Sequence, residues 1–256
     1  QYTFAKGLKK LKADLNNNFF IKFDDTYKVK DYNYSITGKL KKSKFEFSSP
    51  IKNVFATEEI TNIYFSDLEM KTIFKPNTIK ISGEGKYSFD NLNFLNINLE
   101  NNFNNGILNL KLDLDYKKNI EIDFINYKKP EGSVANIFLI LEKKKNNFTI
   151  SELSFKEENN SFKVEGLSFN NNKLLSFKKV EVITAKNDFR IEKGKKIKIK
   201  GTKFDATNLV KVFNKSSKDK IFSKINSAIE IDFKNINVPM SEKLQNFKLI
   251  GEIKKG

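Results

Sequence analysis

In the stretch ILNLKLDLDY, residues 107–116, apolar and polar side chains alternate without a break from Leu108 onwards. Successive side chains of a β-strand point to opposite faces of the sheet. Leu108, Leu110, Leu112 and Leu114 therefore share one face, while asparagine, lysine and aspartate side chains occupy the other. This stretch predicts a β-strand with one apolar and one hydrated face.

The same two-residue period recurs along the chain and is longest in residues 221–233, IFSKINSAIEIDF. At roughly 3.3 Å per residue, such a strand would span about 40 Å, which is longer than a typical globular strand. The connecting segments are short and rich in Asn, Lys and Gly, which predicts an antiparallel meander of hairpins. We expect the following side chains on the apolar faces: Leu108, Leu110, Leu112, Leu114, Ile122, Phe124, Val180, Val182, Ile197, Ile199, Ile229, Ile231 and Phe233.

Helical spacing of apolar residues is confined to two short segments. Residues 4–15 form the first. In the second, Asp205 is available as a cap ahead of a stripe that contains Leu209, Val210 and Phe213. The apolar positions slip by one within residues 92–99, which predicts a β-bulge, and the sequence GEG at 83–85 predicts a bend. Two short helices cannot cover a sheet of this size.

The formal charge of +16 is compatible with an anionic partner. Of the 47 basic residues, only Arg190 is an arginine, whereas recognition of bases and phosphates favours the bidentate guanidinium. The lysine excess therefore indicates a solvated surface, and among anionic partners it favours a phospholipid headgroup over a nucleic acid. We expect no nucleic-acid partner.

The residue types needed for most enzymatic sites are missing. His and Cys are both absent, which excludes Ser-His-Asp and Cys-His nucleophile arrangements and argues against a zinc site. Carboxylate pairs such as Asp113 with Asp115 lie on the hydrated face of an expected strand, where they serve as solubilising charges. We expect neither enzymatic activity, nor a metal, nor a cofactor. The longest apolar run, Ile137 to Leu141, is far shorter than the roughly 20 residues that span a bilayer.

A sheet with one apolar face requires a second layer over that face. A β-sandwich or barrel covers the face with more sheet, and its alternating Leu, Ile and Phe side chains are then an ordinary core. Alternatively, the sheet curves into an open trough whose inside is covered by lipid acyl chains. The long strands and the many phenylalanines, 25 in the chain, favour the trough.

Residues 195–213, KKIKIKGTKFDATNLVKVF, alternate as far as Gly201 and then change to a helical pattern. Together with the segments on either side, this stretch resembles the C-terminal region of AsmA-like proteins, above all the large YhdP and TamB-type members of Gram-negative bacteria. In that family a strand ends at a glycine, and a Phe-Asp-Ala/Leu turn leads into a short helix. The matching residues are Gly201, Phe204, Asp205, Ala206 and Leu209, and the helix would continue to Phe213. The likeness is strongest over residues 160–240.

This resemblance implies a mainly β fold: a long antiparallel meander curved into an open, taco-like hydrophobic groove, with one or two short helices. It implies a single elongated domain over residues 1–256, which we expect to be a fragment of a larger, inner-membrane-anchored periplasmic protein. Its function would be to carry phospholipid along the groove between the inner and outer membranes and so to support outer-membrane homeostasis. The alternative is a structural or adhesive β-sandwich or solenoid domain with a filled core and no ligand.

Overall fold

The computed structural model describes residues 7–52, 59–171, 173–209, 226–239 and 243–253. The chain divides into two compact units. Unit 1 comprises Gln1–Tyr116 with Glu142–Lys145, and unit 2 comprises Lys117–Leu141 with Asn146–Gly256. The single elongated domain expected from the sequence stays a prediction.

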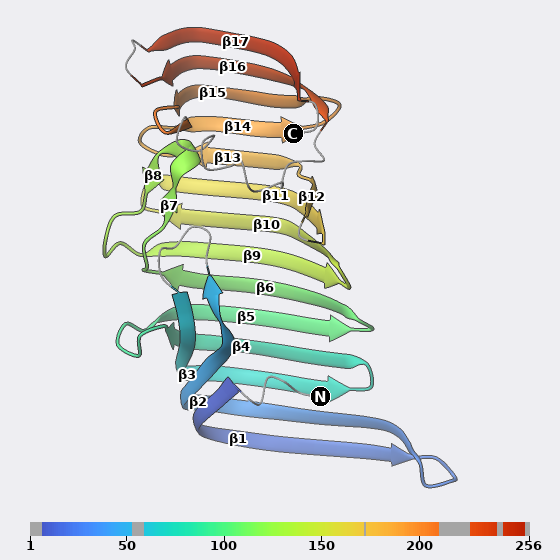
Figure 1. The fold of residues 1–256 in the computed structure, drawn as a ribbon. Coiled ribbons are helices and arrows are strands. Elements are labelled where there is room, and N and C mark those ends of the chain that lie inside the picture. The colour runs from blue at the N-terminus through green and yellow to red at the C-terminus, as the bar shows by residue number, and fades with distance from the viewer. Residues whose placement is uncertain (1–6, 53–58, 172, 210–225, 240–242, 254–256) are drawn as a thin grey trace. The chain divides into compact units, whose positions relative to one another are not determined.

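Unit 1 contains six strands that follow one another in chain order across the sheet (Figure 1). Each strand pairs antiparallel with the next one in the chain. Two of these strands are long, since β2 has 24 residues and β3 has 17, whereas the longest strand expected from the sequence, residues 221–233, belongs to unit 2. The strands are β1 (Leu8–Phe23), β2 (Val29–Lys52), β3 (Glu59–Lys75), β4 (Thr78–Ser88), β5 (Leu95–Asn104) and β6 (Ile107–Tyr116).

The helix expected in residues 4–15 is wrong from residue 8 onwards, where strand β1 begins. β1 pairs with β2 from Leu8, opposite Phe45, to Phe23, opposite Val29. Leu11 and Leu15 are four residues apart, a spacing that fits a helical stripe but equally fits two steps of strand alternation. Hydrogen bonding to the neighbouring strand decides between these conformations, and it cannot be read from local spacing.

The glycines at 83–85 do not form a bend, because both Gly83 and Gly85 lie inside β4. A β-carbon on Gly85 would come within 2.5 Å of the Leu68 Cα and the Asp67 carbonyl oxygen. Asp67 has a positive φ of 52°, and the β3–β4 register shifts by one residue beside it. The glycine therefore makes room for a bulge in β3. The bulge expected in residues 92–99 is also wrong, since residues 89–94 form a loop and β5 begins at Leu95.

Unit 2 contains a sheet in the order β9-β10-β11-β13-β14-β15-β16-β17, with β12 paired to β11 beside β13. A separate two-stranded sheet, β7 with β8, flanks a single 3-10 turn, η1. The elements are β7 (Glu121–Ile122), η1 (Asp123–Ile125), β8 (Tyr127–Lys128), β9 (Ala135–Lys144), β10 (Asn147–Glu157), β11 (Asn160–Asn170), β12 (Lys173–Ser176), β13 (Lys179–Ile183), β14 (Asp188–Lys193), β15 (Ile197–Asp205), β16 (Ser227–Asn237) and β17 (Leu244–Ile253).

One pair of strands departs from the antiparallel meander. β15 and β16 run parallel, with Ile199 opposite Ile231 and Asp205 opposite Asn237. A parallel pair requires a connection that returns the chain to the starting end of the first strand. The segment between Asp205 and Ser227 makes this connection. It includes most of the expected second helix, so Val210 and Phe213 lie outside the described residues, as do residues 221–225 of the expected long strand.

The expectation of a mainly β antiparallel meander is confirmed. In the parts of the chain that the structure describes, no strand pairing closes the sheet of either unit into a barrel. The substantial contacts between strands are also those between hydrogen-bonded neighbours. Neither unit therefore shows, in these parts, the second large sheet that a β-sandwich requires.

Candidate functional site

The apolar residues of β5 and β6 share one face of the unit 1 sheet. Leu112 lies opposite Leu99, and Leu114 lies opposite Ile97. On the other face, Lys111 forms an ion pair with Glu100 at 3.8 Å. The four leucines of β6 thus share a face as the alternation predicts, and all four are half-buried rather than buried. Their role in lining a lipid groove stays a prediction.

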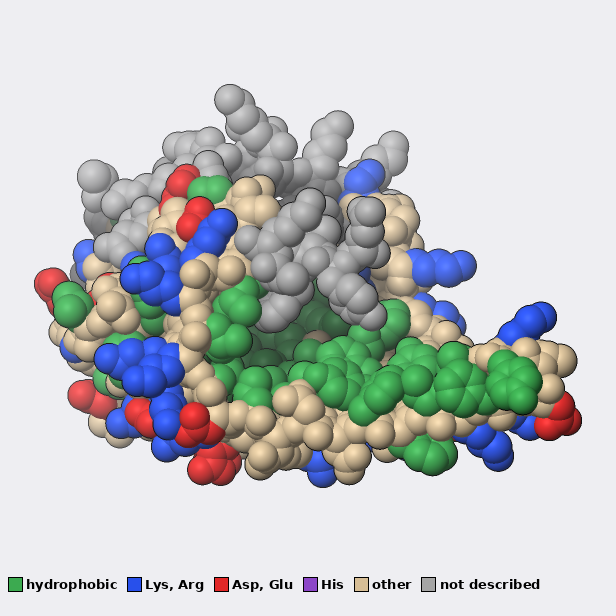
Figure 2. Space-filling model, turned by 90° about the horizontal axis from the view of Figure 1, so that it is seen from below, with side chains coloured by type: hydrophobic (Ala, Val, Ile, Leu, Met, Phe, Trp, Pro, Cys, Tyr) green, Lys and Arg blue, Asp and Glu red, His purple; other side chains and the backbone are tan. Residues whose placement is uncertain are grey.

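The apolar face continues onto β1–β3 through aromatic side chains. The Tyr34 ring lies between Phe19, in an edge-to-face contact at 5.9 Å, and Phe74, in a stacked contact at 5.7 Å. Phe19 is nevertheless 60% exposed. Viewed from the β1 end, hydrophobic side chains form a row along the inner side of a hollow (Figure 2). This part of the apolar face is open.

Unit 2 has a corresponding apolar face. Val182 lies opposite Phe189, which lies opposite Gly201, and Gly201 lies opposite Phe233. One row further along the strands, Val180, Ile191, Ile199 and Ile231 follow one another in the same way. The expected lining residues that share this face are Val180, Val182, Ile197, Ile199, Ile229, Ile231 and Phe233.

The expected lining positions Ile122 and Phe124 do not lie on a strand of the main sheet. Ile122 ends β7, and Phe124 lies in η1. The residues 120–134, which we call the clasp, include β7, η1 and β8 and pack against one end of the unit 2 apolar face. The Phe124 ring contacts Phe204 at 5.7 Å, and the Tyr127 ring contacts Phe162 at 4.8 Å. This end of the face is covered by the chain itself.

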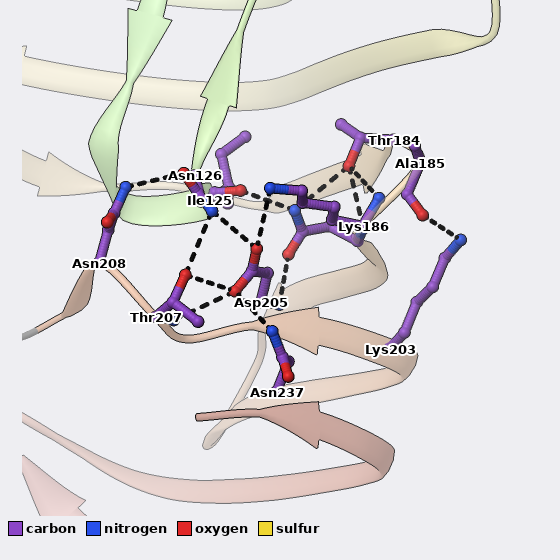
Figure 3. Close-up of polar contacts among 11 residues, drawn as sticks. Ile125, Asn126, Thr184, Ala185, Lys186, Lys203, Asp205, Thr207, Asn208 and Asn237 are labelled. Carbon is purple, nitrogen blue, oxygen red and sulfur yellow. Dashed lines mark hydrogen bonds and ion pairs between the residues drawn. The ribbon is translucent and has the colours of Figure 1, made fainter. Parts of the chain in front are cut away.

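The clasp is held by a network of hydrogen bonds around the buried carboxylate of Asp205 (Figure 3). The Asn126 amide donates to Asp205 Oδ2 at 2.8 Å and to Thr207 Oγ1 at 3.1 Å. Thr207 in turn donates its hydroxyl and its backbone N–H to Asp205 Oδ1. Asn208 donates to Asn126 Oδ1, and Asn237 donates to Asp205 Oδ1. Three separate segments therefore converge on one carboxylate.

The charge of Asp205 is stabilised where it lies. Burial opposes ionisation of the carboxyl, but the hydrogen bonds from Thr207, Asn126 and Asn237 outweigh burial and hold its pKa below the usual range. Lys186 Nζ lies 3.6 Å from Asp205 Oδ2 and adds an opposite charge. The network is thus satisfied with Asp205 ionised.

Asn187 lies in the β13–β14 turn and connects Asp205 to the clasp. Its side chain is fully buried, donates to the Ile125 carbonyl at 2.7 Å and accepts from the Asp205 backbone N–H at 2.8 Å. It also donates to Thr184 Oγ1 at 3.2 Å. Asn126, Asn187 and Asn237 were not singled out from the sequence, because asparagine is common throughout the chain and nothing in their spacing distinguishes them.

A second buried polar group, the Glu157 carboxylate at the end of β10, also contacts the clasp. The Tyr127 hydroxyl donates to Glu157 Oε2 at 3.3 Å, and Asn160 donates to the same oxygen at 2.7 Å. Burial and the neighbouring Glu157 charge raise the pKa of Tyr127. Lys129 is fully buried, its ammonium donates to the Pro130 and Ser133 carbonyls, and burial lowers its pKa. The Glu157 contacts join β8 to the end of β10, and the Lys129 contacts lie within the clasp itself.

The strand-to-turn residues behave partly as expected. β15 does not end at Gly201 but continues to Asp205, so the expected end of the strand is wrong. A β-carbon on Gly201 would lie 2.5 Å from Phe189 Cβ and 2.7 Å from the Phe233 ring, so the glycine allows close packing. Asp205 does cap a turn, in which the Leu209 N–H donates to the Ala206 carbonyl at 3.0 Å. The continuation towards Phe213 lies outside the described residues.

No protein-family model, curated protein or solved structure matches this chain. In the described ranges, no group of three or more acidic, histidine or cysteine side chains could hold a metal ion. No helix in these ranges combines the length and apolar character needed to cross a membrane. The distinctive features of the molecule are therefore its two apolar sheet faces and the clasp at one end of the second.

Proposed function

We propose that this chain is a non-enzymatic lipid-binding segment whose apolar sheet faces hold phospholipid acyl chains. One observation carries the proposal: in the described parts of each unit, the long strands form one open sheet with an apolar face, and no second large sheet lies over that face. Phe19 on the unit 1 face is 60% exposed and Leu249 on the unit 2 face is 41% exposed, whereas Val182, Ile197 and Phe233 of the unit 2 face are buried. A large accessible apolar surface of this kind marks a binding site.

Acyl chains suit such a face because their binding requires no particular polar partner. Each buried methylene contributes about 0.8 kcal/mol, so contact with a few side-chain rows is enough to hold a lipid tail. The opposite faces are lined by charged pairs such as Lys111 with Glu100 and Lys179 with Glu181, the latter at 2.8 Å. The sheet therefore separates an apolar side from a hydrated side.

The cellular role that fits this chemistry is transfer of phospholipid between the inner and outer membranes of a Gram-negative envelope. The resemblance of residues 160–240 to AsmA-like proteins supports this role, together with the open single-layered sheets. In this proposal the chain is a periplasmic part of a larger protein anchored in the inner membrane, and it contributes to outer-membrane homeostasis. Inner and outer membranes would be contacted by other parts of that protein.

The test is native mass spectrometry of the purified chain after incubation with phospholipid, together with chemical extraction of bound lipid. Leu110→Asp and Ile231→Asp each place a charge on an apolar face, and we expect each variant to lose lipid while keeping the β circular dichroism signal. Asn109→Asp is the matched control, because residue 109 is the exposed neighbour on the hydrated face of the same strand. It should retain lipid as the wild type does.

Full lipid retention in both apolar-face variants would contradict the proposal, as would a wild-type chain that binds no lipid. In the second case a structural or adhesive role without ligand would be favoured. A filled core would give a third result, because a buried unpaired charge would then unfold the chain instead of only releasing lipid. Unfolding of both variants would therefore also count against an open lipid-binding face.

A further inference from the structure

The two ends of the unit 2 apolar face differ in their chemistry. At one end, the β10–β11 pair closes at Glu157 and Asn160, and β15 ends at Asp205. The clasp covers this end, which contains the two buried carboxylates. The opposite end, which we call the lysine end, is formed by the β14–β15 turn at residues 194–196 and by the start of β12.

Lys193 lies at the lysine end and belongs to the apolar face. The alternation of β14 places Phe189, Ile191 and Lys193 on one side, and the register pairs Lys193 with the buried Ile197. The other polar residues of β14, Asp188, Arg190 and Glu192, lie on the opposite side. The remaining lysines of β13–β17 also fall on the hydrated face, namely Lys179, Lys198, Lys200, Lys203, Lys234 and Lys248.

Among the described residues, the ammonium of Lys193 contacts an aromatic ring and forms no ion pair. Its Nζ lies 5.8 Å from the centroid of the Phe177 ring. Within the described residues, no carboxylate forms an ion pair with it, whereas nearby Lys196 pairs with Glu230. Lys173 and Lys195, at the same end, are exposed and likewise have no ion pair there. A positive charge at the rim of an apolar surface is the arrangement that an amphipathic anion requires.

The apolar side chains adjoining Lys193 match the other half of such an anion. Leu174 and Ile197 form a buried cluster against which Phe177, Ile191 and other apolar side chains pack. From Ile197 to Phe204 the face extends for seven residue steps, about 23 Å at roughly 3.3 Å per residue. Ile197, Phe189 and Phe233 are buried on it, and the half-buried side chains of Ile191, Ile199 and Ile231 are the ones that lipid tails would contact. The acyl chains of one leaflet fill about half of the roughly 30 Å hydrocarbon core of a bilayer. The face is long enough to hold one set of tails.

We propose that Lys193 binds the phosphate of a phospholipid whose acyl chains lie along the unit 2 apolar face towards the clasp. This inference rests on the proposed lipid-binding function and adds to it a headgroup position and an orientation. Lys173 and Lys195 supplement the positive potential at the same end. The reverse orientation would bring the phosphate to the covered end, next to the carboxylates of Glu157 and Asp205.

The test compares two lipids that differ only in the phosphate-bearing headgroup: phosphatidylglycerol and diacylglycerol with the same acyl chains. Apparent dissociation constants are measured for the whole chain by native mass spectrometry titration. Lys193→Gln should weaken phosphatidylglycerol binding on the order of tenfold, the effect of losing one hydrogen bond to a charged group. It should leave diacylglycerol binding unchanged, and Lys193→Arg should restore phosphatidylglycerol binding.

Lys198→Gln is the matched control, because Lys198 is an exposed lysine on the hydrated face of the adjoining strand β15. It removes the same charge and should change neither affinity. Wild-type affinity of Lys193→Gln for phosphatidylglycerol would overturn the headgroup assignment, as would an equal loss in the Lys198 variant. If the wild type binds both lipids but Lys193→Gln has no effect, only this inference fails. If the wild type binds neither lipid, the proposed function fails as well.

Discussion

The side-chain amide of Asn126 donates a 2.8 Å hydrogen bond to Asp205 Oδ2, across 79 positions of the sequence. This bond joins the turn between β7 and β8 to the end of β15 (Figure 3). Asn126 itself has a positive φ of 48°, a conformation that asparagine adopts more readily than most residues. Asn126 therefore contributes to the clasp in two ways: its backbone adopts the conformation that the turn requires, and its side chain binds Asp205.

Asn187→Ala should destabilise unit 2. The substitution leaves the Ile125 carbonyl and the Asp205 backbone N–H without their buried partner, and each such group costs about 1–3 kcal/mol. We expect a loss of roughly 2–4 kcal/mol in the free energy of unfolding, measured by urea denaturation. Asn159→Ala, at an exposed turn, is the control and should change stability by less than about 0.5 kcal/mol. Equal stability of the two variants would show that the Asn187 bonds do not hold the clasp.

Asp205 should make the stability of unit 2 sensitive to acid. Its pKa is lower in the folded chain than in the unfolded chain, where it is about 3.9. The resulting stabilisation is present above that value and is lost as the pH falls through the lower folded pKa. We expect the free energy of unfolding of the wild type to fall more steeply below about pH 4 than that of Asp205→Asn. Parallel pH profiles of the two proteins would contradict this prediction.

Gly201→Ala should be destabilising because the added methyl group has no room. The new β-carbon would meet Phe189 and Phe233 at less than 3 Å, which forces shifts in a packed aromatic cluster. The expected cost is about 1–3 kcal/mol in the free energy of unfolding. Gly194→Ala is the matched control, since nothing lies within 4 Å of its added carbon. A glycine-to-alanine change without strain is neutral or slightly stabilising.

Tyr87 and Tyr127 should ionise late in an alkaline titration. Burial is the main cause of the raised pKa of both side chains, and neighbouring negative charge adds to it. Tyr87 also donates to the Asp115 carbonyl at 2.6 Å. Because the folded pKa is raised above about 10, the associated stability is present below that pH and is lost as the pH rises.

Phenolate absorbance measures this directly. Tyr87→Phe and Tyr127→Phe should each remove one late-titrating group from the eight tyrosines of the chain. Loss of an early-titrating group instead would show that the hydroxyl is accessible to solvent.

Strand alternation was the reliable part of the sequence signal. The faces of β6, β13, β14 and β15 follow directly from the two-residue period, because each side chain position along a strand is fixed by the preceding one. The spacing of apolar residues led to a wrong prediction where one spacing fits both a helix and a strand, as with Leu11 and Leu15 in β1, which are four residues apart. It also failed at Phe124, whose segment continues an alternating pattern but forms the η1 turn of the clasp.

The polar site could not be predicted, because its members are brought together only by the fold. Asn126, Asn187 and Asn237 come from three turns or strand ends and meet at Asp205: Asn126 and Asn237 donate to its carboxylate, and Asn187 accepts from its backbone N–H. Of this network, only Asp205 was expected, since its role as a turn cap is a local property that sequence spacing can show.

By itself, the sequence determined the two-sided character of the strands, since alternation is a local property of an extended backbone. Only the tertiary structure decided that β16 pairs parallel to β15, that β1 is a strand, and that the clasp covers one end of an apolar face. These features depend on hydrogen bonds and packing between segments distant in the chain. Local residue spacing does not specify such partners, because the hydrogen bonds and packing contacts between them form only when the segments come together in the folded chain.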